Sequence, residues 1–430
     1  MVQDNNLIAA AQASAETEAM MKTLLTRILL PAMLCTAAAL PCCSRDAAQP
    51  GLPAPPQGSV GAPAATPAEP RPRNSVRTIN GCTVVTLEGT PEQIGTFYGK
   101  ALGPTIKRLI DDMILNDFGR NPAAYQNVLA GTLVMEQFQP KDYLAELRAI
   151  ADSAGVPYEN LLMLQYFGDV RRAIEGPGAS ALCTSLAILP PNTREPACIV
   201  GRNFDYYDNG AGEYASIIAH YRPKGKIPFV TITWAGIING WTLINERGMV
   251  FSNNTCWGDA DSLEGISTCF LLRHLAEEAA TLREAVEMVN RLPLACGTAV
   301  LIASGRELDA AIVEFDHKQL VVRRPIDGFV GAGNGFEQLY RSEPFEGKYW
   351  GRVAAALEVV RENAGRVDLD TNVAGREGVP ITSMNLHCAN IDATNLRFRV
   401  AMGRIPAFRL PFKAFRITAE GVVEDGEHMD

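Results

Sequence analysis

The first part of the chain with a folding pattern carries apolar residues at helical spacing. Between Ile94 and Met113 they stand three or four residues apart, which predicts an amphipathic helix. Thr90 and Pro91 precede this run, and Gln93 lies three positions after the threonine. Thr90 can cap a helix and Gln93 can complete a capping box, while Pro91 suits the first helical position. The pattern therefore predicts a helix that begins at Pro91.

Two more helical regions and one strand complete this first part. Residues 142–151 and 158–167 show helical periodicity, and residues 82–87 alternate as a strand does. The sequence thus predicts a mostly helical segment that runs to the turn cluster Gly176-Pro177-Gly178.

After that turn cluster, short apolar runs typical of strands replace the helical spacing. They cover residues 184–189, 197–200, 216–221, 229–234, 241–244, 249–252, 298–303, 310–315, 319–323, 383–390 and 396–401. Helices are predicted at 267–280 and at 350–363. Another helix is predicted to begin after Thr281, which can form a capping box with Glu284. This order predicts an α+β domain in which two antiparallel sheets carry helices on their outer faces.

The N-terminus has the pattern of a targeting segment. Lys22 and Arg27 precede an apolar run at 28–40 that is too short to span a bilayer, so residues 1–43 are predicted to be a secretory signal peptide. Translation that starts at Met20 or Met21 would remove the acidic residues in front of the signal. We expect export from a bacterial cell, either to the periplasm or to a membrane as a lipoprotein.

The choice between these two locations rests on a pair of cysteines. Lipidation of Cys42 or Cys43 would anchor the protein to a membrane, although Leu40-Pro41 matches a lipoprotein cleavage site poorly. Residues 44–74 follow and are dominated by Pro, Ala and Gly. Such a segment buries too little apolar surface to fold and is predicted to be a flexible linker.

Composition narrows the classes of partner. The chain has 430 residues and a net charge of −9, which disfavours nucleic acids and anionic membranes as partners. Seven of the ten cysteines lie beyond the signal region, and no CxxC pair occurs among them. An odd number without this spacing is neither a disulfide framework nor a zinc pattern. At least one free thiol is therefore expected in an exported protein.

Cys183 is the cysteine that the surrounding sequence singles out. It opens the first strand after the helical part, and Gly201-Arg202-Asn203-Phe204-Asp205 follows one hairpin later. A thiol is a good nucleophile only as the thiolate. A cysteine at a chain end carries its own base, because an α-amine titrates near neutral pH. Cleavage of the peptide bond before Cys183 would create that chain end.

This arrangement resembles the choloylglycine hydrolase superfamily, which includes bile-salt hydrolases, penicillin V acylases and acid ceramidase. The segment from Thr90-Pro91 to Gly95 and Gly99 also resembles the leader of the isopenicillin N acyltransferase branch. The resemblance extends from about residue 80 to residue 405. It implies a four-layer αββα sandwich of the N-terminal-nucleophile (Ntn) type.

The resemblance also implies roles for other residues. Arg202 would favour the Cys183 thiolate, and Asp205 would orient the new α-amine. Asn254, with Asn253 as an alternative, corresponds to an asparagine of the oxyanion hole. The remaining candidates are Asn334 as a second amide donor and Arg352, with which Arg341 competes as the last arginine of the family. Amide donors of this kind typically raise the rate by a factor of about 10²–10³ each.

The sequence therefore predicts a helical leader at 75–182, as the alpha chain, and a catalytic domain at 183–430, as the beta chain. The predicted activity is hydrolysis of linear C–N amide bonds in small N-acylated molecules, or acyl transfer, without a cofactor or metal. The alternative is a non-catalytic exported or lipid-tethered binding protein on the same fold. Neither the amine and acyl groups of the substrate nor the oligomeric state follows from the sequence.

Two other chemistries were considered for these residues. His387 could pair with Cys183 as in papain-like proteases, but Cys183 lacks the helix start that such a nucleophile uses, and His387 lies in a strand pattern. The other four histidines lack metal-ligand spacing, and Asp259 and Asp261 do not form a calcium loop.

Overall fold

The computed structural model describes residues 73–118, 121–175, 182–340 and 348–426. The chain divides into residues 1–68 and residues 69–430, and all described residues belong to the second unit. The predicted signal peptide at 1–43 and all but the last two residues of the predicted linker at 44–74 lie outside the described residues. So do the turn cluster at 176–178 and Arg341.

The larger sheet contains nine strands in the order β1-β2-β5-β6-β7-β8-β9-β10-β11. Their bounds are β1 Ser75–Ile79, β2 Cys82–Gly89, β5 Ser216–Pro223, β6 Phe229–Trp234, β7 Thr242–Asn245, β8 Met249–Thr255, β9 Thr298–Ser304, β10 Asp309–Phe315 and β11 Leu320–Arg323. The prediction of a purely antiparallel sheet was wrong in one place, because β2 and β5 pair in parallel. Parallel neighbours need a long crossover connection, and the leader helices together with the hairpin that contains Cys183 and Arg202 provide it.

The second sheet contains seven strands in the order β12-β3-β4-β13-β14-β15-β16 and is antiparallel throughout. Their bounds are β3 Leu182–Ile188, β4 Ile199–Asp205, β12 Phe329–Ala332, β13 Asn385–Asp392, β14 Arg397–Met402, β15 Lys413–Thr418 and β16 Gly421–Glu424. The hairpin that contains Cys183 and Arg202 therefore lies in the interior of this sheet, between β12 and β13.

The helices of the described residues lie between strands along the chain, since β1 and β2 precede α2 and four strands follow α10. Their bounds are α2 Pro91–Ile110, a π-helical turn Asp111–Leu115, α3 Asn116–Phe118, α4 Pro122–Glu136, α5 Lys141–Ala154, α6 Tyr158–Glu175, α7 Ala211–Ala215, α8 Thr268–Glu278, α9 Leu282–Arg291 and α10 Lys348–Glu362. Both predicted capping boxes are present, Thr90 with Gln93 and Thr281 with Glu284. Among the described helices, none is both long enough and apolar enough to cross a bilayer.

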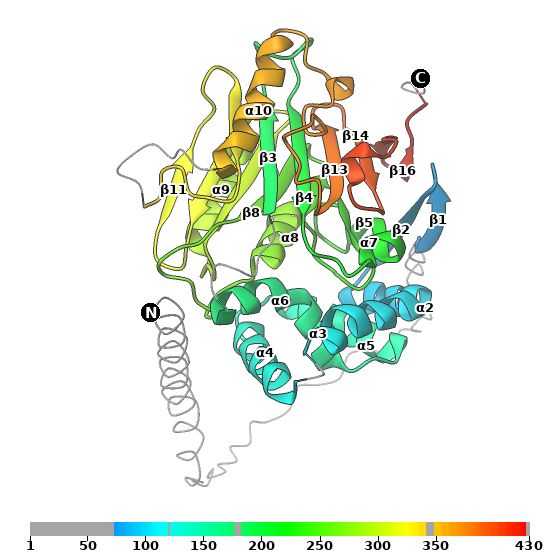
Figure 1. The fold of residues 1–430 in the computed structure, drawn as a ribbon. Coiled ribbons are helices and arrows are strands. Elements are labelled where there is room, and N and C mark those ends of the chain that lie inside the picture. Colours follow the sequence, from blue (N-terminus) through cyan, green and yellow to red (C-terminus); the bar gives the residue numbers. More distant parts are fainter. Residues whose placement is uncertain (1–72, 119–120, 176–181, 341–347, 427–430) are drawn as a thin grey trace, which may run out of the picture. The chain divides into compact units, whose positions relative to one another are not determined.

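Successive side chains along a strand point to opposite faces of its sheet, so they pack into different hydrophobic cores. These cores separate the layers of sheets and helices. In β9, Ala299 and Leu301 contribute to a core between the two sheets, whereas Val300 and Ile302 face the core under α2, α5, α6, α8 and α9. In β3, Leu186 points to a third core beneath α10. Figure 1 shows α10 on the outer side of the sheet that contains β3, β4 and β13. The predicted α+β fold with two sheets between helices is confirmed.

A buried ion cluster joins the helical leader to the rest of the fold. The guanidinium of Arg273 on α8 donates to both carboxylate oxygens of Glu146 on α5, at 3.1 and 2.7 Å, and to Glu277 at 2.8 Å. Tyr143 also donates to Glu277, at 2.9 Å. The side chains of Arg273, Glu146 and Glu277 are at most 3% exposed, so each charge depends on the others.

We expect Arg273→Ala to lower the free energy of unfolding by about 3–5 kcal/mol, because two buried carboxylates would lose their partner. Arg283→Ala is the matched control, since Arg283 forms an exposed ion pair with Glu287 on the next helix and should change stability by less than about 1 kcal/mol. Urea denaturation of both variants at neutral pH measures the difference. Equal losses in the two variants would show that the cluster does not hold the leader.

Candidate active site

Cys183 is the second residue of β3 and its side chain is buried, with 1% of the residue exposed. Across the ladder it lies opposite Phe204 of β4. On its other side β12 pairs with β3 only as far as Ala332 and Ser185. Asn334 lies two residues further on, and its Oδ1 accepts the hydrogen bond of the Cys183 main-chain N–H at 2.6 Å. A side chain thus holds the nitrogen that would become the α-amine after cleavage.

Arg202 brings a positive charge to the thiol from β4. Its side chain is fully buried, and its Nη2 lies 3.3 Å from Sγ of Cys183. Nη1 donates to Ser185 Oγ at 3.1 Å and to Asn254 Oδ1 at 3.0 Å. Strand alternation explains this meeting, because Ser185 lies two residues after Cys183 and directly opposite Arg202.

The thiol is nevertheless held mainly in its neutral form in the uncut chain. Burial raises the pKa of Cys183 above its ordinary value, and the nearby Arg202 guanidinium opposes only part of that shift. A neutral thiol needs a base before it can attack a carbonyl. Attack by this thiol would therefore require a neighbouring group to accept its proton.

Asp205 ends β4 and lies directly opposite Leu182, the residue before the predicted cleavage point. Its Oδ1 accepts from Asn385 Nδ2 at 2.8 Å, and its Oδ2 accepts from the Ile381 main-chain N–H at 3.1 Å. Burial raises the pKa of Asp205 to about 6, although Asn385 and Arg352 both counteract the shift. The carboxyl group can therefore change charge near neutral pH.

Arg352 on α10 links this carboxyl group to the nitrogen of Cys183. Its Nη1 donates to Thr184 Oγ1 at 3.0 Å and lies 3.4 Å from Asp205 Oδ2. Its Nη2 donates to Asn334 Oδ1 at 2.7 Å, the same oxygen that accepts from Cys183. All six candidates from the sequence thus meet in one network, which includes Arg352.

The two adjacent asparagines of β8 point to opposite faces of the sheet. Asn254 faces the neighbouring sheet, where its Oδ1 accepts from Arg202 and Ser185 and its Nδ2 donates to the Ala332 carbonyl at 2.7 Å. Asn253 lines a cavity on the other face, and its Oδ1 has no hydrogen-bond partner among the described residues. Their predicted parts in an oxyanion hole stay predictions, as does that of Asn334, whose Nδ2 donates to the Thr255 carbonyl at 2.8 Å.

His387, the alternative base, is engaged elsewhere. Its Nε2 lies 2.8 Å from Thr242 Oγ1, and its ring stacks on that of Phe204 with centroids 5.4 Å apart. Burial and then the charge of Arg202 hold the pKa of His387 well below its ordinary value. Within the described ranges, no group of three or more His, Cys, Asp or Glu side chains could hold a metal ion.

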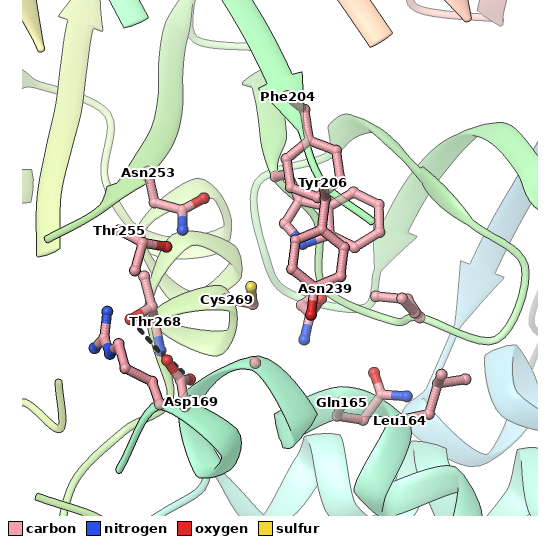
Figure 2. Close-up of a pocket in the computed structure, with 14 residues that line it drawn as sticks. Leu164, Gln165, Asp169, Phe204, Tyr206, Asn239, Asn253, Thr255, Thr268 and Cys269 are labelled. Atoms are coloured by element: carbon pink, nitrogen blue, oxygen red, sulfur yellow. Dashed lines mark hydrogen bonds between the residues drawn. The ribbon is translucent and has the colours of Figure 1, made fainter. Parts of the chain in front are cut away.

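A small cavity of about 60 Å³ lies beside this network, between the leader helix α6 and the larger sheet. Figure 2 shows Phe204 and Tyr206 on one side of it, and Asp169 hydrogen-bonded to Thr268 on another. Its apolar and polar walls are made by Leu164, Gln165, Gly168, Asp169, Arg172, Phe204, Tyr206, Ile237, Asn239, Trp241, Asn253, Thr255, Thr268 and Cys269. Phe204 joins the cavity to the network, because it is the strand neighbour of Cys183 and stacks on Trp241 at 4.1 Å.

Sequence reasoning missed several residues that position this network. Ser185 and Thr184 follow Cys183 directly, and the strand period alone places them on opposite faces. Asn385, which holds Asp205, and Trp241, which stacks on Phe204, come from distant strands and loops. No local pattern points to these two, because their function depends on contacts that only the fold creates.

Comparison with known proteins gives a partial but consistent result. Residues 192–343 match the model of the family described as acyl-coenzyme A:6-aminopenicillanic acid acyl-transferase. This match agrees, for that part of the chain, with the resemblance to acyltransferases that the sequence indicated.

Two curated proteins of Dictyostelium discoideum are similar in sequence. Protein dcd1B is 24% identical over 204 residues, which are 47% of this chain and 38% of that protein. Protein dcd1A is 22% identical over 275 residues, 56% of this chain and 60% of that protein. The chain thus spans less than two thirds of the length of either relative. Among solved structures, the Caenorhabditis elegans ortholog of N-acylethanolamine-hydrolyzing acid amidase has a TM-score of 0.41 at 17% identity, covering 49% of this chain and 93% of that chain.

The raised pKa of Asp205 gives a prediction for the dependence of stability on pH. The folded-state pKa of about 6 exceeds the value of 3.8 for an unperturbed aspartate. Its stabilising contribution is therefore full below the unfolded value and is lost as pH rises through the folded value. In an uncut Cys183→Ala background, Asp205→Asn should abolish this loss, which amounts to about 2 kcal/mol between pH 4 and pH 7. Urea denaturation across that pH range measures it.

Asp425→Asn provides a control of opposite sign. Burial would raise the pKa of Asp425, but hydrogen bonds from Arg397 and Arg416 hold it below its ordinary value. Its contribution to stability is therefore present at neutral pH and is lost as the pH falls. If the Asp205 and Asp425 variants altered the pH profile in the same direction, the buried, partly neutral state of Asp205 would be wrong.

Proposed function

We propose that this protein is a self-cleaving N-terminal cysteine hydrolase that acts on linear amide bonds of small N-acylated molecules. The observation that carries the proposal is the pairing of two contacts on one residue. The thiol of Cys183 lies beside Arg202, and its main-chain nitrogen is held by Asn334 at the end of β12. Nucleophile and future base are thereby positioned together before cleavage.

Self-cleavage follows from groups that are already near one another. Sγ of Cys183 attacks the carbonyl carbon of Leu182, the C–N bond breaks, and the nitrogen takes the proton of the thiol. Water then attacks the resulting thioester, so that Leu182 ends in a carboxylate and Cys183 regains its thiol. The product is a two-chain protein whose second chain begins with a cysteine.

Substrate turnover repeats the same bond changes. The α-amine of Cys183 takes the thiol proton while Sγ attacks the carbonyl of the substrate amide. The protonated amine then donates to the leaving nitrogen, which departs as a free amine and leaves an acyl thioester. Hydrolysis of that thioester releases the carboxylic acid, whereas attack by a second amine gives acyl transfer.

Electrostatics supports the assigned roles of the charged residues. Arg202 stabilises the thiolate and the thioester-forming transition state, since it touches Sγ directly in a water-poor site. The new α-ammonium would replace the amide N–H as donor to Asn334 Oδ1, two strand positions from the β12 end. Arg352 tethers both Asn334 and Asp205, so that the acceptors around the amine keep their places.

The division into chains and the location of the protein extend the proposal. Cleavage before Cys183 would separate the leader from the catalytic domain, and the buried cluster of Arg273, Glu146 and Glu277 would keep them together. The basic and apolar pattern of residues 22–40 supports export, with lipidation of Cys42 or Cys43 as the route to a membrane.

The similar proteins support the same class of reaction. The matching family is described by an acyl-transferase activity on 6-aminopenicillanic acid, and the similar nematode protein hydrolyses N-acylethanolamines. Both descriptions involve an acyl group on nitrogen. The substrate class that we propose is this shared chemistry, without a particular acyl chain or amine.

Replacement of Cys183 tests the proposal most directly. Wild-type protein should yield two chains by intact-mass analysis, with Cys183 at the new N-terminus, and should cleave members of a panel of N-acyl amides. Cys183→Ala should remain one chain and lose all activity, because without the thiol neither the thioester nor the free α-amine that serves as its base can form.

Cys198→Ala is the matched control, since Cys198 is also a buried free cysteine of the same hairpin but has no arginine at its sulfur among the described residues. It should be processed and active. Processing of Cys183→Ala would contradict the mechanism. A wild-type protein that stays uncut yet binds a small molecule would favour the non-catalytic alternative.

A further inference from the structure

Asn239 is a buried amide side chain whose hydrogen-bonding groups are unused. The residue is fully buried in the loop between β6 and β7 and lines the cavity beside Cys183. Neither its Oδ1 nor its Nδ2 has a hydrogen-bond partner among the described residues. A buried polar group of this kind costs about 1–3 kcal/mol when it stays unpaired, so an apolar residue would make the protein more stable here.

The loop around Asn239 is held firmly on both sides. Gln165 of α6 donates to the Gly236 carbonyl at 2.9 Å and accepts from the Ile238 N–H at 3.1 Å. Arg273 donates to the Ile238 carbonyl at 2.9 Å. The unpaired amide is therefore fixed in position by paired neighbours, which is the arrangement expected of a preorganised binding group.

The cavity around this amide suits a small neutral group. Phe204 and Trp241 form an aromatic wall. At its polar end, Arg172 lies 3.3 Å from the carboxylate of Asp261, and burial raises the pKa of Asp169 despite the opposing charge of Arg172. The charges of Arg172 and Asp261 balance each other, and the Asp169 carboxylate accepts a hydrogen bond from the Thr268 N–H, so the charged groups at this end already have partners within the protein.

We propose that Asn239 is a specificity-determining residue that pairs with a neutral secondary amide within the substrate, next to the scissile bond. Its Nδ2 donates to the carbonyl of that amide, and its Oδ1 accepts from the N–H. This inference rests on the proposed function, because the cavity adjoins Cys183 only through Phe204 and matters for turnover only if Cys183 is the nucleophile.

Water explains how the site discriminates. The volume of about 60 Å³ has room for about four water molecules, which can solvate Asn239 in the free protein. A substrate amide that displaces them restores both hydrogen bonds, whereas a hydrocarbon chain leaves the buried amide unpaired. The preference is therefore expected for polar over apolar acyl groups of the same length.

Three p-nitroanilides of equal chain length separate these contributions. Their acyl groups are N-acetylglycyl, with an N–H and a carbonyl, 4-oxopentanoyl, with the carbonyl alone, and pentanoyl, with neither. For processed wild-type protein we expect kcat/KM to fall in that order, by about 10- to 100-fold overall for two hydrogen bonds. The near-isosteric variant Asn239→Leu should cleave the three with similar kcat/KM or prefer the pentanoyl probe.

The unfolding temperature distinguishes a binding role of Asn239 from a purely structural one. If Asn239 served only stability, Asn239→Leu would lower that temperature. Asn239→Leu should unfold at the same temperature as the wild type or higher, because an apolar side chain of similar size replaces a buried amide that has no protein partner among the described residues. Thr132→Val is the control, since Thr132 Oγ1 is also buried without a partner among the described residues but does not line the cavity. It should be as stable as the wild type or more so and should keep the wild-type order of probes.

Binding to uncut protein keeps the inference separate from the reaction. N-acetylglycine methylamide and N-methylpentanamide are compared by thermal shift on Cys183→Ala and on Cys183→Ala/Asn239→Leu. A preference for N-acetylglycine methylamide that disappears with Asn239→Leu supports the inference, whether or not any probe is cleaved. Failure of the processed protein to cleave any probe would reject only the proposed function. The inference would be overturned if both proteins showed the same thermal shifts with the two ligands, or no shift at all. It would also be overturned if Asn239→Leu were less stable than the wild type and kept the wild-type order of probes.

Discussion

The burial of one guanidinium fixes the rest of the site. Arg202 lies wholly between the two sheets, where a charge is tolerated only when polar atoms surround it. Ser185 and Asn254 provide such atoms from facing sheets, and the Cys183 thiol completes the set. The thiol is therefore positioned by the same requirement that stabilises the arginine. A thiol held in this way depends on the packing of two sheets, and not on a mobile loop.

A second network holds the nitrogen of Cys183 from the opposite face of its sheet. Arg352 reaches inward from α10 and contacts Thr184, Asp205 and Asn334. Thus the inner sheet interface controls the sulfur, while the outer helix controls the nitrogen and its acceptors. Because the sheet separates them, Arg202 contacts the sulfur of Cys183 from one face, while Arg352 contacts Asn334, which holds the nitrogen, from the other.

The sequence predicted the parts of this arrangement that local patterns encode. Capping boxes located α2 and α9, and apolar runs located most of the strands, because both signals depend on near neighbours. It missed α4, whose apolar residues are not gathered on one face, and the short strands β1, β15 and β16 at the sheet edges. The parallel pairing of β2 with β5 was missed because it joins segments separated by the whole leader. The candidate residues were found by motif, but their partners were not, since Asn385 and Trp241 meet the site only through tertiary contacts.

The contrast between two neighbouring asparagines shows which part of the site serves stability and which is open to a ligand. Asn254 uses its oxygen and its nitrogen within the protein, so its side chain contributes to the folded state whether or not substrate is present. Asn253 and Asn239 instead carry buried oxygens without partners among the described residues, on the cavity side of the larger sheet. Unpaired buried polar groups are uncommon in native proteins, and each one calls for an explanation such as a bound ligand or an ordered water. In the enzyme that we propose, the cavity between α6 and β8, more than the arginine network, is where we expect differences in substrate choice, since residues there can change without loss of the contacts that hold Cys183.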